Sequence, residues 1–547
     1  MTRRIVRTGI QLALLSCIVL FLVFFLDNRY RVLPQSIHSH LPLHHEGLVI
    51  TDITVQTCST LNPLTKCKLN QDQWHQVGKD LYLGSGWRKA YVHITRKKEE
   101  ELTDEDKVII DVRTGKLDPA MGEKSQASDK WESRPCSIWL KRSAKRHASD
   151  SKQVITAVDV LFGADAAEPR LGWELVKPGA LQLSGGEFKD PRLSIRRGPP
   201  HKTDKPPLRI RKDGKFKIMQ VSDLHLSTGV GACRDPEPKD ANGGHCEADP
   251  RTLDFVERVL DEEKPDFVVL SGDQVNGDTA PDAQSAMFKI AALLAEHKKP
   301  YAAIFGNHDD EGALSRGAQM SLYEQLPYSY SEAGSNMIEG VGNYYVEILA
   351  HGTKHSALTL YFLDTHSYSP DEAHYNGYDW LKPNQINWFK TTASGLKDAH
   401  SHYTHTHLNM AFIHIPLPEY TNKENDRVGQ WLEGVTAPKF NSGFRDALVE
   451  QDVKAVSCGH DHANDYCSLS KNQGTGDPEL WMCYAGGSGF GGYGGYGGYH
   501  RRLRVFEIDT NQARISTWKR LEYGDIGKRL DEQIIVDLGK VVPLQQQ

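Results

Sequence analysis

The strongest constraint on the fold of this chain is a repeated pattern between Leu208 and Leu521. Short apolar runs such as KFKIMQV, PDFVVLS and PYAAIF read as strands, and each runs into a polar loop. Helical segments are predicted between these strands, at Asp249–Glu263 and Asp282–His297. Strands that alternate with helices predict an α/β layered fold, in which the chemistry lies in loops at the strand ends.

Five of these strands end in residues that can bind a metal ion. In chain order they are Asp223 and His225, then Asp273, then Asn307, His308 and Asp309, then His414, and finally His460 and His462. One histidine beside an apolar strand is more often a hydrogen-bonded core residue than a ligand. If all five endings were only structural, each would bury a polar group at a cost in free energy and without a compensating gain. Carboxylate, imidazole and amide oxygen suit Mn, Fe or Zn. So many potential ligands are too many for one ion and suit two ions about 3.5–4 Å apart, bridged by one carboxylate.

The motifs that carry these residues follow one another in an order that resembles a known family. D-x-H, G-D-x-x-N, G-N-H-D, a strand-borne histidine and G-H-x-H follow one another as they do in the calcineurin-like metallophosphoesterase superfamily, over roughly residues 208–521. The insert CRDPEP…CEADPRTLDF and the run GGYGGYGGY also resemble fungal membrane-anchored phosphatases related to the purple-acid-phosphatase-like proteins of plants. The resemblance implies a four-layer αββα sandwich of the α/β (α+β) class.

The resemblance also implies two metal sites that share one bridging carboxylate. The first site would consist of Asp223, His225, Asp273 and His462, and the second of Asp273, Asn307, His414 and His460. His308 would face the phosphate and protonate the leaving oxygen or stabilise the transition state, and Asp309 would orient His308. Asn276 stands where purple enzymes carry their tyrosine, so no tyrosinate–iron site is expected. Two divalent or mixed-valence ions (Mn, Fe or Zn) are therefore expected.

The implied activity is a phosphatase that hydrolyses phosphate monoesters by a metal-activated hydroxide, with a phosphoprotein or a small phosphate ester as substrate. Two alternatives stay open: a phosphodiesterase on the same metal core, and a non-catalytic membrane scaffold. A cysteine phosphatase is disfavoured, since no cysteine heads a phosphate-cradling loop followed by arginine. The net charge of −6 argues against a nucleic-acid partner. The sequence does not indicate the oligomeric state.

The N-terminus carries a long apolar run, residues 9–26, after a basic flank at residues 1–8. The run is longer than the core of a cleaved signal peptide and lacks an Ala-x-Ala site, which predicts a single-pass transmembrane signal-anchor. The arginines before it favour a cytosolic N-terminus and a lumenal catalytic domain, in the endoplasmic reticulum, vacuole or secretory pathway. The alternative is a domain on the cytoplasmic face.

The rest of the chain divides by composition. We expect a spacer at 27–47, a small β-rich domain at 48–195, a linker at 196–207, the metallophosphoesterase domain at 208–521 and a C-terminal tail at 522–547. Eight of the nine cysteines follow the apolar run. The pairs Cys58 with Cys67, Cys233 with Cys246, and Cys467 with Cys483 would suit disulfides in an oxidising lumen, although spacing alone does not settle the connectivity.

Two further segments allow opposite interpretations. The glycine-rich stretch from Gly486 to His500 is either a mobile rim loop whose tyrosines contact substrate or a flexible connection between two strands. Asp461, between two predicted ligands, is expected to face away from the metals, and Cys458 to be a small buried residue.

Overall fold

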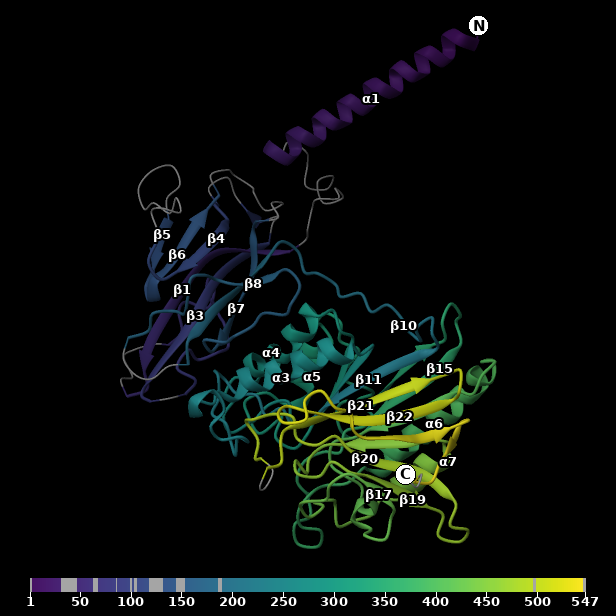
Figure 1. Ribbon diagram of the computed structural model, residues 1–547. Coiled ribbons are helices and arrows are strands. Elements are labelled where there is room, and N and C mark those ends of the chain that lie inside the picture. Colours follow the sequence, from purple (N-terminus) through teal and green to yellow (C-terminus); the bar gives the residue numbers. More distant parts are fainter. Residues whose placement is uncertain are drawn as a thin grey trace. The chain divides into compact units, whose positions relative to one another are not determined.

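The computed structural model contains two compact units. The first comprises residues 1–162 and 172–201, and the second residues 163–171 and 202–547 (Figure 1). The structure describes residues 2–30, 47–61, 67–84, 86–98, 101–102, 106–117, 131–143, 153–184, 189–494 and 498–544. Most of the predicted spacer at 27–47 lies outside these ranges.

Helix α1 (Thr2–Tyr30) contains the apolar run that the sequence predicts to be a membrane anchor. Within the described part of the chain, no helix has both the length and the apolar character needed to cross a membrane. The side chains of residues 24–26, the last three of the predicted anchor, lie outside the described residues. The transmembrane anchor is therefore not confirmed.

Apart from α1 and a short 3-10 turn at Pro135–Ser137, the described part of the first unit is built from β-strands. Its described residues form three antiparallel sheets of three strands, in the orders β1-β3-β2, β4-β6-β5 and β7-β9-β8. The strands are β1 (Leu48–Ser59), β2 (His75–Gln76), β3 (Arg88–Lys98), β4 (Ile109–Thr114), β5 (Trp131–Arg134), β6 (Ile138–Arg142), β7 (Ile155–Phe162), β8 (Trp173–Leu175) and β9 (Pro191–Arg197). One buried cluster, including Ile53, Leu140 and Val160, joins all three sheets.

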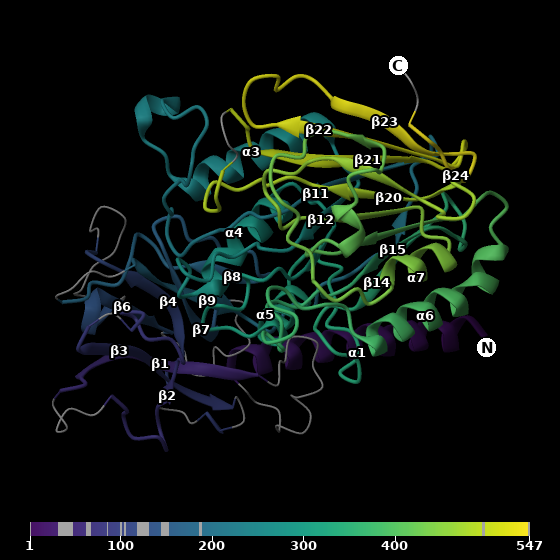
Figure 2. The same cartoon turned by 90° about the horizontal axis from the view of Figure 1, so that it is seen from below.

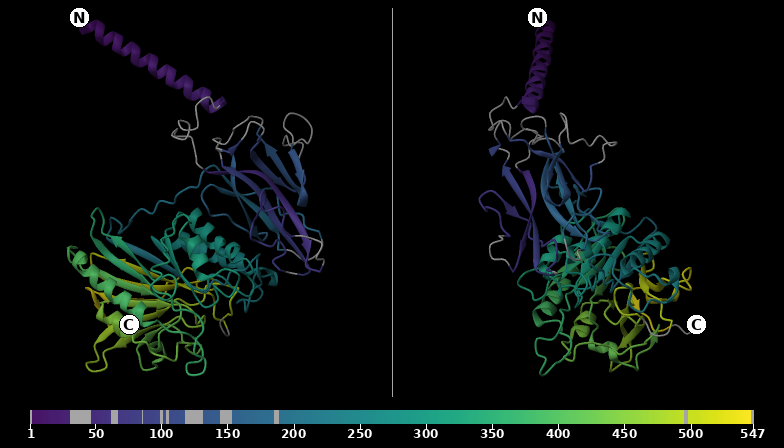
Figure 3. Two further views of the ribbon diagram at one scale, coloured as in Figure 1. Left: turned by 180° about the vertical axis from the view of Figure 1, so that it is seen from behind. Right: turned by 90° about the vertical axis from the view of Figure 1, so that its left-hand side faces the viewer.

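The second unit has two large sheets. The eight-stranded sheet runs in the order β10 (Leu208–Arg209), β14 (Tyr344–Leu349), β15 (Ser356–Phe362), β16 (Leu408–Phe412), β18 (Ala455–Cys458), β20 (Pro478–Tyr484), β19 (Cys467–Lys471), β17 (Arg427–Val428). The seven-stranded sheet runs in the order β13 (Tyr301–Ile304), β12 (Phe267–Ser271), β11 (Lys215–Val221), β21 (Arg502–Asp509), β22 (Arg514–Leu521), β23 (Leu530–Asp537), β24 (Lys540–Val541). Figure 3 shows both sheets from two other directions.

The two sheets face each other, and helices cover their outer faces (Figure 2). Between the sheets, Ser457 Oγ donates to Gln220 Oε1 at 2.5 Å, and the rings of Phe412 and Phe506 lie 6.2 Å apart. The helices are α3 (Ala248–Glu263), α4 (Ala283–Glu296), α5 (Arg316–Tyr323), α6 (Pro383–Ser401) and α7 (Phe444–Glu450). Helices α6 and α7 pack on the eight-stranded sheet through Phe389 and Phe444. This arrangement is the mixed α/β fold that the sequence predicts.

Parallel strand pairing brings the polar loops together. In the seven-stranded sheet β11, β12 and β13 are parallel neighbours, and in the eight-stranded sheet β15, β16, β18 and β20 are parallel neighbours. Because parallel strands end at the same edge, the loops that follow them gather at one side of each sheet. This is the physical reason why ligands far apart in the sequence can form one site.

The seven-stranded sheet continues beyond residue 521, where the sequence pattern places the end of the domain. Strand β23 pairs with β22, and β24 pairs with β23. Trp481 Nε1 donates to the carbonyl oxygen of Val542 at 3.1 Å, so this segment also contacts the other sheet. Most of the predicted C-terminal tail is thus part of the folded unit.

Residues 163–171 follow β7 in the chain but belong to the second unit. Asp165 Oδ2 lies 2.5 Å from the buried ammonium of Lys289 in α4, and the guanidinium of Arg170 lies 5.0 Å from the ring centre of Phe288. Lys289 also pairs with Asp249 at 2.7 Å and donates to the carbonyl oxygen of Ser227. The chain therefore passes into the second unit and back before β8 begins.

The three expected cysteine pairs are all present. Disulfides join Cys58 to Cys67, Cys233 to Cys246, and Cys467 to Cys483. The last of these bridges the adjacent strands β19 and β20, in which the two cysteines are direct partners. Cys458 is a free, fully buried thiol, as expected.

Candidate metal centre

All seven predicted ligands follow the ends of parallel strands and are buried. Asp223 and His225 follow β11, Asp273 follows β12, Asn307 follows β13, His414 follows β16, and His460 and His462 follow β18. Six of them form two groups whose ligand atoms all lie within 4.8 Å of one another: Asp223, His225 and His462, and Asp273, His414 and His460. The structure thus brings the predicted residues together as two neighbouring clusters.

Asp273 lies between the two groups. Its Oδ2 atom is 3.3 Å from His414 Nε2, within its own group, and 3.7 Å from His225 Nε2, in the other group. Its Oδ1 atom accepts from the backbone N–H of His308 at 2.8 Å, which fixes the carboxylate against the next loop. This is the position that a bridging carboxylate needs.

The backbone at the site is strained. Asp223, His225, Asp273 and His460 all have positive φ angles, between 48° and 78°. Residues other than glycine adopt this region at a cost of about 1–3 kcal/mol each, and such residues concentrate at functional sites. The surrounding fold therefore holds these ligands in place against a local energetic preference.

The glycines before the ligands leave room for close approach. A Cβ atom at Gly272 would lie 2.2 Å from His414 Nδ1, and one at Gly306 would lie 2.1 Å from Asp273 Oδ1. Gly272 also has a φ of 100°. A side chain at either position would push a ligand away, which explains the G-D and G-N pairs in the motifs.

Hydrogen bonds fix which nitrogen of two imidazoles faces the site. His414 Nδ1 lies 2.9 Å from the carbonyl oxygen of Ser271, and His462 Nδ1 lies 2.9 Å from that of Tyr493. A carbonyl only accepts, so each Nδ1 carries the proton and each Nε2 offers its lone pair to the site. Nε2 of His414, Nε2 of His460 and both polar atoms of the Asn307 side chain make no hydrogen bond in the described part of the chain. Such buried, unbonded atoms fit a metal site.

Burial sets the protonation of the ligands. It lowers the pKa of His225 and of His460 to about 3, so both imidazoles are neutral near pH 7, as metal ligands must be. For Asp223, burial raises the pKa but the nearby His462 outweighs it, and the value falls to about 2. Asp223 is therefore ionised, and His225 and His460 are able to coordinate. For His414, burial lowers the pKa but the Asp273 carboxylate outweighs it and raises the pKa to about 9, so this imidazole must lose a proton before it can bind a metal.

His308 lies at the edge of the centre and is partly exposed, and Glu311 contacts it. Its ring centre is 5.2 Å from that of His225, and its Nδ1 is 2.7 Å from Glu311 Oε2. Burial lowers the pKa of His308, but Asp273 and Glu311 outweigh this and raise it above its ordinary value.

The predicted partner of His308, Asp309, has another role in the structure. Its carboxylate accepts from the backbone N–H groups of Asp273, Val275 and Gly306, at 2.7–2.9 Å. Asp309 therefore ties the G-D loop to the G-N loop, and the orientation of the imidazole falls to Glu311. Sequence reasoning missed Glu311, although a carboxylate three residues after a histidine in a tight turn is within reach of that ring.

Residues 486–494 of the glycine-rich segment form a packed wall of the centre, which neither interpretation of the sequence foresaw. Residues 481–492 are buried. A Cβ atom at Gly492 would lie 2.5 Å from both His225 Cδ2 and His462 Cε1. The ring of Tyr493 stacks on that of His462 at 3.9 Å and 3°. The glycines let the backbone approach the ligands, while the tyrosine covers one of them.

Tyr493 is itself held in place. Its hydroxyl accepts from the backbone N–H of His462 at 3.0 Å and donates to Glu433 at 3.0 Å. The hydroxyl is thus occupied by these two groups. Asp461 also faces away from the clusters, as predicted, because its carboxylate accepts from Thr436 and from the Tyr484 hydroxyl.

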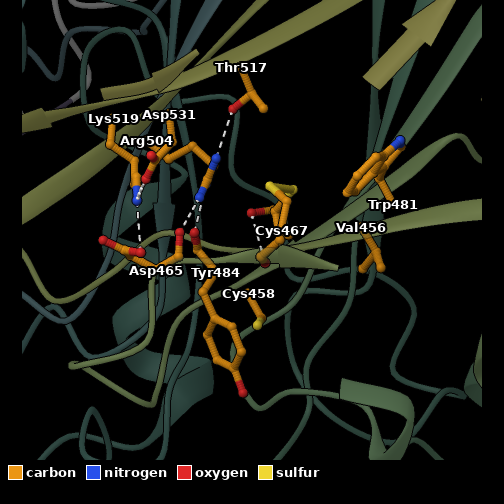
Figure 4. The surroundings of a disulfide bond; sticks show 12 residues. Val456, Cys458, Asp465, Cys467, Trp481, Tyr484, Arg504, Thr517, Lys519 and Asp531 are labelled. Atoms are coloured by element: carbon orange, nitrogen blue, oxygen red, sulfur yellow. Dashed lines mark hydrogen bonds and ion pairs between the residues drawn. A yellow bond between two sulfur atoms is a disulfide. The ribbon is translucent and has the colours of Figure 1, made fainter. Parts of the chain in front are cut away.

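A group of charged side chains that includes Asp465, three residues after His462, lies near a disulfide bond (Figure 4). Asp465 is fully buried and pairs with Lys519 at 2.7 Å and with Arg502. The buried guanidinium of Arg504 donates to the backbone oxygens of Asp465 and Tyr484 and, at 3.0 Å, to Thr517 Oγ1. These contacts connect the loop after β18 to strands β21 and β22 of the other sheet.

Comparison with known proteins shows the family to which the chain belongs. Residues 216–464 match the family model described as calcineurin-like phosphoesterase. Phosphatase DCR2 of Saccharomyces cerevisiae is 40% identical over 403 residues, which cover 71% of this chain and 67% of DCR2. Probable inactive purple acid phosphatase 29 of Arabidopsis thaliana is 35% identical over 344 residues, which cover 60% of this chain and 85% of that protein.

Among solved structures, a dimetal phosphatase from Danio rerio aligns with a TM-score of 0.40 and 12% identity, over 59% of this chain and 99% of that one. The fold and the paired ligand groups, together with these sequence relatives, define a hydrolase that acts on phosphoric ester bonds. The chain belongs to the calcineurin-like metallophosphoesterase family.

Proposed function

We propose that this chain hydrolyses phosphate monoesters with the help of two metal ions. The observation that carries the proposal is the pair of buried ligand groups with the Asp273 carboxylate between them. Two ions held in this way could bind the oxygens of one phosphate group from both sides.

The donor set supports a metal pair. We assign Asp223, His225, Asp273 and His462 to the first ion, and Asp273, Asn307, His414 and His460 to the second. Carboxylate, imidazole and amide donors favour Mn, Fe or Zn. When bound, such ions would supply Lewis acidity toward the phosphate and lower the pKa of a water molecule toward about 7.

We assign to His308 the protonation of the leaving group. Because Glu311 binds Nδ1, the nitrogen left to face the substrate is Nε2. The imidazolium donates its Nε2 proton to the ester oxygen as the phosphorus–oxygen bond breaks, and so an alcohol leaves in place of an alkoxide. The backbone N–H of His308 donates to Asp273, and Glu311 contacts the ring, so both support the position of the imidazole.

Two variants test these assignments. His308→Ala should lower kcat by about 10²–10⁴-fold, the usual contribution of a general acid, while two ions stay bound. Loss of metal from this variant would refute its assignment to the leaving group. Asp273→Asn should lower the occupancy of both ions, as measured by metal analysis of the purified protein. Full occupancy with a normal rate would refute the bridge.

A phosphodiesterase on the same core is the nearest alternative. Comparing the hydrolysis of p-nitrophenyl phosphate with that of bis-p-nitrophenyl phosphate separates the two activities, and the proposal requires faster hydrolysis of the monoester. The name of the Arabidopsis relative, a probable inactive phosphatase, makes a non-catalytic scaffold the second candidate. Purified protein that binds two ions and hydrolyses no phosphate ester would favour that candidate.

The substrate and compartment belong to the same proposal. We infer a phosphoprotein or a small phosphate ester as substrate, and a catalytic domain inside an oxidising compartment, attached to the membrane by residues 9–26. The three disulfides support an oxidising lumen. Protease treatment of sealed microsomes, followed by carbonate extraction, tests this. Digestion without detergent would show a cytosolic domain, and extraction by carbonate would refute the anchor.

A further inference from the structure

An exposed aromatic side chain stands at the edge of the metal centre. Tyr368, in the loop between β15 and α6, is 52% exposed. The loop folds back on itself: Ser369 N–H donates to the carbonyl oxygen of Gly377, and Asp379 N–H donates to that of Ser367. Tyr368 and Tyr378 are therefore paired across a short antiparallel bridge.

Stacking fixes this tyrosine pair against a ligand of the second metal. The rings of Tyr368 and Tyr378 lie 5.5 Å apart at 20° to each other. Tyr378 in turn meets His460 edge to face, with ring centres 4.3 Å apart. Ser367 Oγ contacts the carbonyl oxygen of Asn307 at 3.4 Å. The exposed ring is thus the outer layer of a stack that begins at the metal centre.

The same tyrosine is connected to the group assigned to the leaving oxygen. Its hydroxyl lies 3.4 Å from Glu311 Oε1, while Glu311 Oε2 binds His308 Nδ1. Tyr368 and His308 therefore contact one carboxylate from two sides. Both residues therefore border the part of the site where a leaving group protonated by His308 would lie.

The charge on this side of the site disfavours a second anion on the leaving group. Glu311 is a carboxylate, and the buried guanidinium of Arg316 is already shared by Asp310 and Asp364. The same loop bears two more aromatic rings, since Tyr375 and Trp380 pack with Phe440 at 4.8–5.4 Å. This surface suits an uncharged aromatic ring better than an additional phosphate.

We propose that the preferred substrates are aryl phosphate monoesters, of which phosphotyrosine side chains are the biological class, with the substrate ring stacked on Tyr368. This inference rests on the monoesterase activity proposed above. The oxygen of water forms the new bond to phosphorus and the aryl ester bond breaks. The phenolic oxygen takes a proton, and the products are tyrosine and inorganic phosphate. Stacking of this kind changes binding by roughly two- to tenfold.

The test uses the metal-loaded full chain and one peptide made with either phosphotyrosine or phosphoserine. Tyr368→Leu should raise KM for the phosphotyrosine peptide by roughly two- to tenfold and change the phosphoserine values by a smaller factor. Tyr368→Phe keeps the ring but removes the hydroxyl contact with Glu311, so it should keep the wild-type ratio of the KM values for the two peptides. Tyr523→Leu is the matched control, because Tyr523 is 49% exposed and lies outside the site; it should leave both substrates unchanged.

Wild-type protein provides a second measurement that needs no variant. Phenylphosphonate should inhibit roughly five- to tenfold more strongly than methylphosphonate. Equal inhibition, or an equal effect of Tyr368→Leu on both peptides, overturns the aryl preference and leaves the monoesterase proposal standing. A wild-type chain that hydrolyses neither peptide nor p-nitrophenyl phosphate overturns both.

Discussion

Glu311 shows how one carboxylate can position a reacting group. It binds His308 Nδ1 at 2.7 Å and is not itself among the metal-ligand groups. Glu311→Gln weakens this contact, so the imidazole should lose its fixed orientation and kcat should fall by about 10–100-fold with phenyl phosphate. The fall should be smaller with p-nitrophenyl phosphate, whose leaving group needs less protonation. Steady-state kinetics with both esters and metal analysis measure the effect.

Glu311→Asp separates contact from charge in the same experiment. This substitution keeps the carboxylate but shortens the side chain. If the direct contact with His308 Nδ1 is needed, kcat of the variant should also fall. Normal kcat for both esters in Glu311→Gln would show that His308 does not depend on this residue.

At the scale of elements, the glycine-rich segment after β20 should be sensitive to small substitutions. Gly492→Ala places a methyl group 2.5 Å from carbon atoms of His225 and His462. We expect affinity for the first metal to fall by about 10–100-fold, with the second site retained, because the clash displaces ligands of only one group. Metal analysis after dialysis should then find one ion where the wild type holds two.

Gly395→Ala is the matched control for that substitution. Gly395 lies in α6, and a Cβ atom added there would meet nothing within 4 Å. Alanine should therefore leave both metals bound and stabilise the helix slightly. If Gly492→Ala keeps two ions with unchanged affinity, the packed wall has no role in holding the first site.

The buried charges between the loop after β18 and strands β21 and β22 support another prediction. Burial would raise the pKa of Asp465, but Lys519 and Arg502 outweigh it and hold the pKa below its ordinary value. Asp465→Asn leaves these cations without their shared partner and should lower the free energy of unfolding by about 3–5 kcal/mol. Asp531→Asn, which removes a partly exposed partner of Lys519, should cost less than about 1 kcal/mol.

Urea unfolding of both variants measures the difference, and its pH dependence checks the cause. A depressed carboxyl pKa gives stability that is complete above the unfolded value of about 3.9 and is lost as pH falls through the folded value. The gap between wild type and Asp465→Asn should therefore shrink on acidification below about pH 4. A gap that stays constant with pH would mean that the ionised carboxylate is not its source.

At the scale of the whole molecule, residues 163–171 should stabilise the second unit. Asp165→Ala removes one carboxylate from the buried Lys289, which keeps Asp249 and two backbone carbonyls, so we expect a loss of about 1–3 kcal/mol. Asp249→Ala should cost more, because Asp249 is the more deeply buried partner. Thermal unfolding of the full chain measures both. Equal stability of Asp165→Ala and wild type would show that the segment contributes nothing.

The sequence predicted the parts of the fold that local pattern determines. Apolar strands that end in D-x-H or G-N-H-D place their polar residues by chain connectivity, and the order of these motifs resembles a known family. The six residues of the two buried groups could therefore be named in advance. Three features depend on contacts that composition does not encode. They are the orientation of His308 by Glu311, the Tyr493 ring that covers His462, and the burial of the glycine-rich residues up to Gly492. Glycine repeats are usual in flexible linkers, and only the position of His225 and His462 turns this one into a packed wall.

Residues 163–171 belong to the second unit, although the strands on both sides of them belong to the first. This has a consequence for folding during synthesis. Domains generally fold as units, the N-terminal one first, while the rest of the chain is still being made. The strands of the β-rich unit are complete once Arg197 has emerged, before β11 and helix α4 exist. Asp165 and Arg170 cannot make their contacts with Lys289 and Phe288 until those two residues have been synthesised. The first unit is thus finished early but carries a segment whose folding depends on residues translated much later.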